Sequence, residues 1–120
     1  MKNYDAVVIG FGKGGKTLAG EMADKGWKVA VIEKSDKMYG GTCINVGCIP
    51  TKYLINEAAK NKFRKLNSFE EYAEEYKNII ENKGELISLF RKKNFDSLDV
   101  KENIDIYTGE GSFVDAKTIE

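Results

Sequence analysis

Two cysteines five positions apart are the residues of this chain best suited to covalent chemistry. Cys43 and Cys48 lie in the stretch Gly40 to Lys52, GGTCINVGCIPTK, and the chain has no other cysteine. Positions i and i+5 of an ideal helix lie more than a turn apart, so a disulfide needs an irregular backbone, which Gly47 and Pro50 favour. A helix N-terminus lowers the pKa of a thiol and favours the thiolate needed for disulfide exchange. The spacing predicts a redox-active pair, with two inert core cysteines as the alternative.

A glycine-rich turn near the amino terminus has the G-x-G-x-x-G pattern of a dinucleotide-binding loop. Gly10, Gly12 and Gly15 form the pattern, with Gly14 in addition, between an apolar run and a helical stretch. In that context the helix N-terminus offers free N–H groups and partial positive charge to a pyrophosphate. We expect Gly10 to allow the turn, Gly12 the approach of the phosphates and Gly15 close packing of the helix. A plain turn before a helix is the alternative.

An acidic residue stands where such loops bind a ribose. Glu33 ends the second apolar run, about 20 residues beyond the glycines. A carboxylate there accepts hydrogen bonds from ribose hydroxyls and repels a 2′-phosphate, so the site suits FAD or NAD rather than NADP. A solvated strand end is the alternative interpretation of Glu33.

The elements around these motifs predict an α/β fold with a Rossmann-like βαβ unit. Residues 4–10 and 28–33 are β-branched runs typical of buried parallel strands. Between them, Lys13 to Lys25 carries apolar residues at helical spacing, and Gly26 is a stop signal. A strand, a helix and a strand within about thirty residues form a βαβ unit.

Two helical stretches follow a loop at residues 35–41. The first begins near Thr42 or Cys43 and runs to about Lys60, with Pro50 in the first turn of its regular part, where its missing N–H costs nothing. The second opens at Ser68 with a capping box and runs as one helix, or one with a weak point at Gly84, to about Lys93. We expect its apolar stripe to pack against the sheet, with a partner-helix surface as the alternative. The stripe comprises Phe69, Tyr72, Tyr76, Ile79, Ile80, Leu86, Ile87 and Phe90.

The last part of the chain is predicted to return to the sheet. Residues 104–109 form a third strand, and residues 111–114 and 117–119 form two short strands around a turn at Asp115 and Ala116. This part is the start of a small antiparallel β-meander that follows the long helical excursion.

Composition excludes several classes of function. Lys plus Arg and Asp plus Glu number 19 each, and this zero net charge argues against a nucleic-acid or anionic-membrane partner. Two cysteines and no histidine cannot complete a four-ligand zinc site, so no metal site is predicted. The apolar runs are too short for a membrane span, and no secretory signal is visible, so we expect a cytoplasmic location.

The stretch from Gly40 to Lys52 resembles the redox-disulfide motif of the class I pyridine nucleotide–disulfide oxidoreductases. That family includes glutathione reductase, dihydrolipoamide dehydrogenase and mercuric reductase. Phe11 to Lys13 and Met38 to Gly41 are most similar to its bacterial reactive-chlorine-resistance branch, and the resemblance covers essentially the whole chain. The positions in register with the motif are the glycine pair, Thr42, Cys43, Asn45, Gly47, Cys48, Pro50 and Lys52.

The resemblance implies a role for each candidate site residue. Cys43 is implied to be the interchange thiol that attacks substrate, and Cys48 the charge-transfer thiol that faces the flavin. Lys52 matches a lysine near flavin N5, where its charge stabilises reduced, anionic flavin; a solvated surface lysine is the alternative. The implied FAD contacts are Gly10, Gly12, Gly14, Gly15, Glu33 and Lys34 toward the ADP half, and Gly41, Thr42, Cys43, Gly47, Cys48 and Lys52 toward the flavin and pyrophosphate.

The resemblance also implies a reaction, and further domains that residues 1–120 do not include. The family passes a hydride from NAD(P)H to FAD, then electrons to the disulfide and on to a small-molecule or metal-ion acceptor. Family chains are several times longer, so residues 1–120 are expected to be the N-terminal part of an FAD-binding domain. The NAD(P) and dimerisation domains of a homodimeric enzyme are then absent, and with them the family's acid/base histidine. We expect the chain alone to be inactive and to bind FAD weakly, if at all.

Two other hypotheses retain fewer of these features. One is a standalone nucleotide-binding or thiol-relay module. The other is a dithiol trap in which Cys43 and Cys48 hold a soft cation such as Cu(I) or Hg(II).

Overall fold

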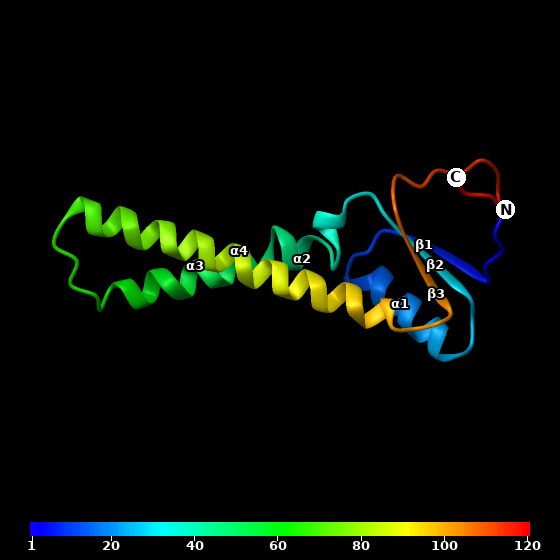
Figure 1. The fold of residues 1–120 in the computed structure, drawn as a ribbon, viewed down its shortest axis with the longest axis horizontal. Coiled ribbons are helices and arrows are strands. Elements are labelled where there is room, and N and C mark those ends of the chain that lie inside the picture. The colour runs from blue at the N-terminus through cyan, green and yellow to red at the C-terminus, as the bar shows by residue number, and fades with distance from the viewer.

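The computed structural model describes residues 1–120 and has two clearly different ends (Figure 1). One end holds a small parallel sheet with a helix packed on it, and the other is a long hairpin of two helices. The Cα atoms extend over 63 × 27 × 17 Å, and both termini lie at the sheet end. None of the helices combines the length and the apolar character that crossing a membrane requires.

Three parallel strands form the sheet. They are β1 (Ala6–Ile9), β2 (Val29–Glu33) and β3 (Ile104–Thr108), with β2 in the centre. Val31 of β2 pairs with Val8 on one side and with Ile106 on the other. The predicted α/β class with a parallel sheet is confirmed.

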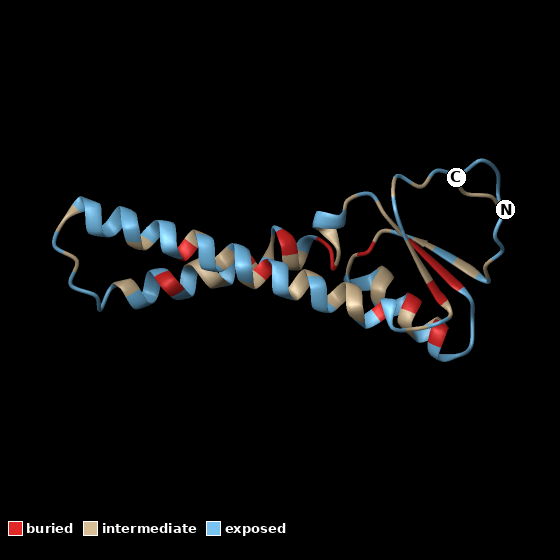
Figure 2. Cartoon of the chain, in the orientation of Figure 1, coloured by how far each residue is buried: buried red, intermediate tan, exposed pale blue.

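Helix α1 (Lys13–Asp24) connects β1 to β2 and supplies one layer of the core. It ends as predicted: the chain reverses at Gly26, whose φ of +87° is a left-handed conformation that glycine adopts without a Cβ penalty. Figure 2 shows that the buried residues of this end gather between α1, the sheet and the end of the last helix. The core cluster comprises Phe11, Ala19, Ala23, Val29, Val31, Leu98 and Ile104.

Strand β1 is parallel as predicted, but the expectation that it is buried is wrong. Its residues alternate between half-buried and exposed, and Val7 and Ile9 are 38% and 46% exposed. The reason is its position: β1 is an edge strand, and α1 covers only one face of the sheet. The central strand β2 shows the burial expected of a parallel strand, with Val29, Ala30 and Val31 buried.

The predicted single helix around the cysteines is two helices. A 3₁₀ turn, η1 (Asp36–Met38), precedes α2 (Thr42–Asn45), and α3 (Cys48–Asn61) follows after a break at Val46 and Gly47. Gly47 has φ −116° and ψ −107°, outside the helical region, which separates the two helices. Pro50 is the third residue of α3, in its first turn as predicted.

Helix α4 (Phe69–Asp99) runs through Gly84 without interruption and ends six residues beyond the predicted end at Lys93. The sequence from Asn94 to Asp99 contains Asn, Asp and Ser, which have poor helix propensity. Burial overrides that propensity, because Leu98 is 3% exposed within the core cluster.

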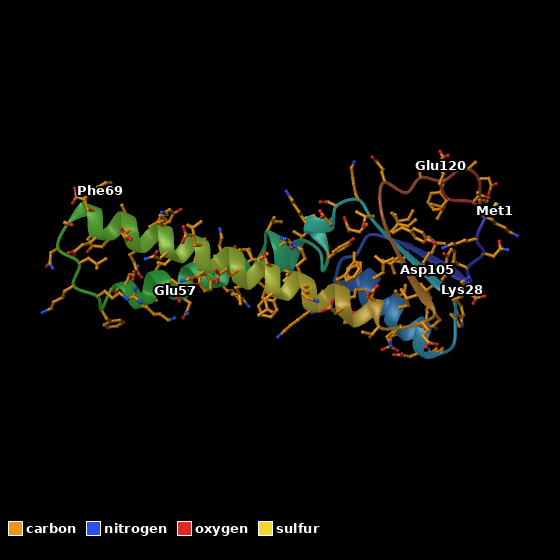
Figure 3. All side chains as sticks on the ribbon, viewed as in Figure 1. Met1, Lys28, Glu57, Phe69, Asp105 and Glu120 are labelled. Atoms are coloured by element: carbon orange, nitrogen blue, oxygen red, sulfur yellow. The ribbon has the colours of Figure 1, made fainter.

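The apolar stripe of α4 does not pack against the sheet, so that expectation is wrong. A helix of 31 residues is about 46 Å long and a five-residue strand about 17 Å, so the sheet covers only a short part of it. The rest lies along α3, where Ile79 lines a groove with Leu54 and Ala58. Phe69 is 81% exposed at the far end of the hairpin, remote from Asp105 of the sheet (Figure 3).

The N-terminal cap of α4 gives a first prediction. The Ser68 side chain accepts a hydrogen bond of 3.2 Å from the backbone N–H of Glu71, and the Glu71 carboxylate accepts one of 2.7 Å from Asn67 N–H. Replacing Ser68 with alanine is expected to lower the free energy of unfolding by about 1 kcal/mol. Urea unfolding followed by far-UV circular dichroism measures it. Ser88→Ala, at an exposed position inside α4, is the control, and an equal loss in both variants would contradict the cap.

The residues after β3 turn back as an antiparallel hairpin. Ser112 and Glu120 exchange two backbone hydrogen bonds of 2.8 and 2.9 Å, and Val114 N–H donates to Thr118. Only the pair Phe113 and Ile119 forms a bridge, so the two predicted short strands are present as a hairpin with a single bridge.

Candidate functional site

The glycine-rich loop and the cysteine-bearing segment touch each other. Gly41, at the start of α2, has φ +83°, and a Cβ built on it would lie 2.6 Å from the Cα of Gly12. The neighbouring Gly40 N–H donates a 3.0 Å hydrogen bond to the carbonyl oxygen of Phe11. A side chain at position 41 would prevent this approach of the two backbones, so the contact requires glycine there. Two motifs far apart in the sequence therefore form one site.

The glycine-rich loop has the shape expected of a phosphate-binding turn. Gly10 has φ +103°, and a Cβ on Gly15 would lie 2.4 Å from the Gly10 carbonyl oxygen, so Gly15 is required where α1 packs on β1. Gly12 and Gly14 instead face open space. The first turn of α1 has no side-chain cap and no acidic residue. Its first N–H groups thus lack intrahelical partners and suit an anion.

Glu33 lies beside this loop. One carboxylate oxygen accepts a 2.9 Å hydrogen bond from Phe11 N–H, and the other accepts one of 3.2 Å from Ser35 N–H. Each oxygen retains a further lone pair, so the half-buried carboxylate can accept from a ribose hydroxyl as well. Lys34 forms a 3.0 Å ion pair with Glu110, just after β3; both side chains are largely exposed, so this pair contributes little to stability.

The break between α2 and α3 brings the two cysteines together. Both are free thiols; Cys43 is half-buried and Cys48 exposed. Interaction with the Cys48 side chain raises the pKa of Cys43, and desolvation raises it further. The backbone N–H of Cys48, at the N-terminus of α3, lowers this pKa by a smaller amount. The lowering expected from a helix N-terminus is therefore present, but the Cys48 side chain outweighs it, and the pKa of Cys43 is raised overall.

The other site residues surround the thiols. Lys52 is exposed, one helical turn beyond Cys48 on the same side of α3. Thr42 is exposed at the start of α2, and its carbonyl oxygen would lie 3.0 Å from a Cβ on Gly47, so the break favours glycine there.

No sequence pattern predicts a structural role for the two residues that hold the site together, Asn45 and Arg91. Asn45 is 7% exposed and forms hydrogen bonds from its side chain to the backbone at Tyr39 and Gly41, and Arg91 of α4 donates to it. The motif includes Asn45 but does not indicate these contacts. Arg91 lies among other charged residues of a long helix, and no local pattern distinguishes it.

Comparison with known protein families gives a match over nearly the whole chain. A family model described as pyridine nucleotide-disulphide oxidoreductase matches residues 4–120. The chain belongs to this family.

Two related proteins and one solved structure illustrate the similarity. The chain is 45% identical over 114 residues to the probable pyridine nucleotide-disulfide oxidoreductase RclA of Escherichia coli strain K12, covering 95% of this chain and 23% of that protein. It is 32% identical over 123 residues to mercuric reductase of Staphylococcus aureus, covering 98% and 22%. The structure of the Cu(II) complex of HOCl-induced flavoprotein disulfide reductase RclA from Escherichia coli matches with a TM-score of 0.81 and 45% identity, covering 96% and 23%. The chain thus spans less than a quarter of the length of these oxidoreductases.

The thiol pair of this oxidoreductase-family chain gives a pH prediction. Because Cys48 raises the pKa of Cys43, the alkylation rate of Cys43 in the reduced chain should rise with pH through a midpoint above that of an ordinary thiol. Cys48→Ala is expected to move that midpoint down and to speed alkylation at pH 7 on the order of severalfold. Peptide mass spectrometry after timed iodoacetamide treatment measures the rate. An unchanged midpoint would contradict the influence of Cys48 on the Cys43 thiol.

The same raised pKa has a consequence for stability. The protonated Cys43 thiol is favoured in the folded chain, so its contribution to stability is fully present below the ordinary thiol pKa. That contribution is lost as the pH rises through the raised value.

Proposed function

We propose that residues 1–120 form the N-terminal FAD-binding and redox-dithiol part of a flavoprotein disulfide reductase. The observation that carries this proposal is the contact between Gly41 and Gly12, which sets the thiol pair next to a loop suited to a pyrophosphate. A dinucleotide held by that loop would extend along the cysteine-bearing segment, which is what electron exchange with a dithiol requires.

The residues fit FAD. The N-terminus of α1 and the open space at Gly12 and Gly14 would take the pyrophosphate, and Glu33 would accept from the ribose hydroxyls. We also assign Lys34 to the ADP half, and Gly41, Thr42, Gly47 and Lys52 to the flavin end. When bound, FAD supplies two-electron transfer between a nicotinamide and the dithiol.

The dithiol is the chain's own redox group. When Cys43 and Cys48 are oxidised, the two thiols lose two protons and two electrons and an S–S bond forms; reduction reverses these changes. We assign acceptor attack to Cys43 and exchange with the flavin to Cys48. One relative is a mercuric reductase and another forms a Cu(II) complex. Thiolates prefer such soft metal ions, so a metal ion or a small disulfide is the proposed acceptor class.

The proposal extends to the whole protein. NAD(P)H is the proposed electron donor, a homodimer the proposed assembly and the cytoplasm the proposed location. The NAD(P) and dimerisation domains are proposed to lie outside residues 1–120.

The visible spectrum tests the flavin part of the proposal. We expect a bound-flavin band from a polypeptide of the relatives' full length that contains these residues, and little or none from residues 1–120 alone. Tight FAD binding by residues 1–120 alone would instead favour a standalone module. Absence of flavin from the full-length polypeptide after reconstitution with FAD would reject the proposed function.

A further inference from the structure

One stripe of α4 connects the separate pieces of the candidate site. Arg91, Asn94, Phe95 and Leu98 follow the spacing i, i+3, i+4 and i+7, so they lie on one side of the helix. This stripe lies at the sheet end of α4, beyond the apolar residues that lie along α3.

Arg91 contacts the site through Asn45. Its Nε–H donates a 2.8 Å hydrogen bond to Asn45 Oδ1. The Nδ2 group of Asn45 then donates to the carbonyl oxygens of Tyr39 and Gly41, at 3.0 and 2.9 Å. Both the oxygen and the nitrogen of the buried Asn45 amide are thus hydrogen-bonded. The amide connects α4 to the turn of residues 39–41 that precedes α2.

The neighbouring residues of the stripe, Asn94 and Phe95, contact the same turn and α1. Asn94 Oδ1 accepts a 2.6 Å hydrogen bond from Lys16 of α1, and its side chain would lie 3.2 Å from a Cβ on Gly40. The Phe95 ring packs on Tyr39 with a centroid separation of 4.9 Å. The turn is therefore held between α1 and α4. Arg91 supplies the hydrogen bond from α4 to Asn45 of α2.

The backbone at Gly41 decides where the Cys43 sulfur lies. Gly41 is the N-cap of α2, its φ is +83°, and Cys43 is the second residue of that helix. Any change in the torsion angles of this glycine rotates α2 and moves Cys43 relative to Cys48, which belongs to α3. Asn45 of α2 also donates to the Tyr39 carbonyl oxygen, which precedes Gly41 in the chain, and this bond restrains the rotation.

We propose that Arg91 is a positioning residue for the dithiol, acting through Asn45 to hold Cys43 within reach of Cys48. The proposal rests on the proposed redox function of the two cysteines. Loss of the Arg91 hydrogen bond leaves a buried acceptor on Asn45 unpaired and loosens the turn. The two sulfurs then sample larger separations, and closure of the disulfide becomes less favourable.

The test is the equilibrium between residues 1–120 and a glutathione redox buffer, with free thiols counted after acid quenching. For Arg91→Met, we expect the equilibrium constant for Cys43–Cys48 disulfide formation to fall about tenfold, which corresponds to about 30 mV. Arg91→Lys keeps the charge but loses the planar fork, so it should restore part of the loss. Lys92→Met is the matched control, because Lys92 is exposed and pairs only with Asp96; it should leave the constant unchanged.

Asn45→Asp is the second variant, since it keeps an acceptor for Arg91 but removes both N–H donors. It should lower the constant at least as much as Arg91→Met does. A change below about twofold in a folded Arg91→Met chain overturns the proposal, because a tenfold loss is expected. Where Arg91→Met fails to fold by circular dichroism, an unchanged constant in Asn45→Asp overturns it. If the unaltered chain forms no Cys43–Cys48 disulfide, the proposed function fails, and this inference with it.

Discussion

Replacement of Cys48 or Cys43 with serine is expected to slow acceptor reduction by the full-length protein at least about a thousandfold. A serine hydroxyl cannot form the S–S bond, and one remaining thiol cannot donate the electron pair that the proposed cycle passes on. The Cys48 side chain raises the pKa of the Cys43 thiol, so the two thiols interact in the reduced chain. The measurement is the steady-state rate with NADH or NADPH and a disulfide or Cu(II) acceptor.

Val46→Ala provides the matched control for the cysteine variants. Val46 stands between the two cysteines and is 65% exposed, so its truncation should leave both the fold and the rate nearly unchanged. Comparable losses in Val46→Ala and Cys48→Ser would point to a disturbed segment. A Cys48→Ser protein that retains most of its rate would show that the acceptor receives electrons without the dithiol.

Replacement of Gly15 with alanine is expected to destabilise the chain by about 2–3 kcal/mol, a large share of the stability of a small domain. The new Cβ would lie 2.4 Å from the Gly10 carbonyl oxygen and 2.9 Å from Val8 Cγ1. The first contact is with backbone, which no rotamer change relieves. The helix must then move away from β1, and the loop that it shares with Gly10 moves with it.

Gly14→Ala is the control, at the adjacent position. A Cβ on Gly14 meets nothing within 4 Å, and Gly14 is already helical. Alanine should therefore leave stability unchanged or raise it by about 0.5 kcal/mol. Urea unfolding of the two variants measures the difference, and equal stabilities would contradict the close packing of α1 on β1.

The local parts of the fold could be predicted because their causes lie close together in the sequence. The βαβ unit follows from two apolar runs, one helical period and the stop at Gly26. An irregular backbone between the cysteines could be predicted, because i and i+5 cysteines do not meet in a regular helix, but not that Gly47 separates two helices there. The Ser68 cap likewise depends on residues within one turn.

The remaining features depend on contacts between distant parts of the chain. The exposure of β1 follows from its position at the edge of the sheet. That position depends on which strands become neighbours, and the apolar run of β1 does not indicate it. The stripe of α4 has the same period whether it faces a sheet or α3, so its partner could not be deduced. The bond between Arg91 and Asn45 joins positions 46 residues apart and has no local pattern. The net direction of the Cys43 pKa shift likewise required the position of the Cys48 sulfur.

Anaerobic reductive titration is the most direct test of a dithiol coupled to FAD. The full-length, FAD-loaded protein is titrated with dithionite, and the electron pairs taken up per flavin are counted. We expect two pairs for the unaltered protein, one for the flavin and one for the Cys43–Cys48 disulfide. The Cys43→Ser, Cys48→Ser double variant should take up one. A single pair in the unaltered, fully oxidised protein would contradict the proposed function.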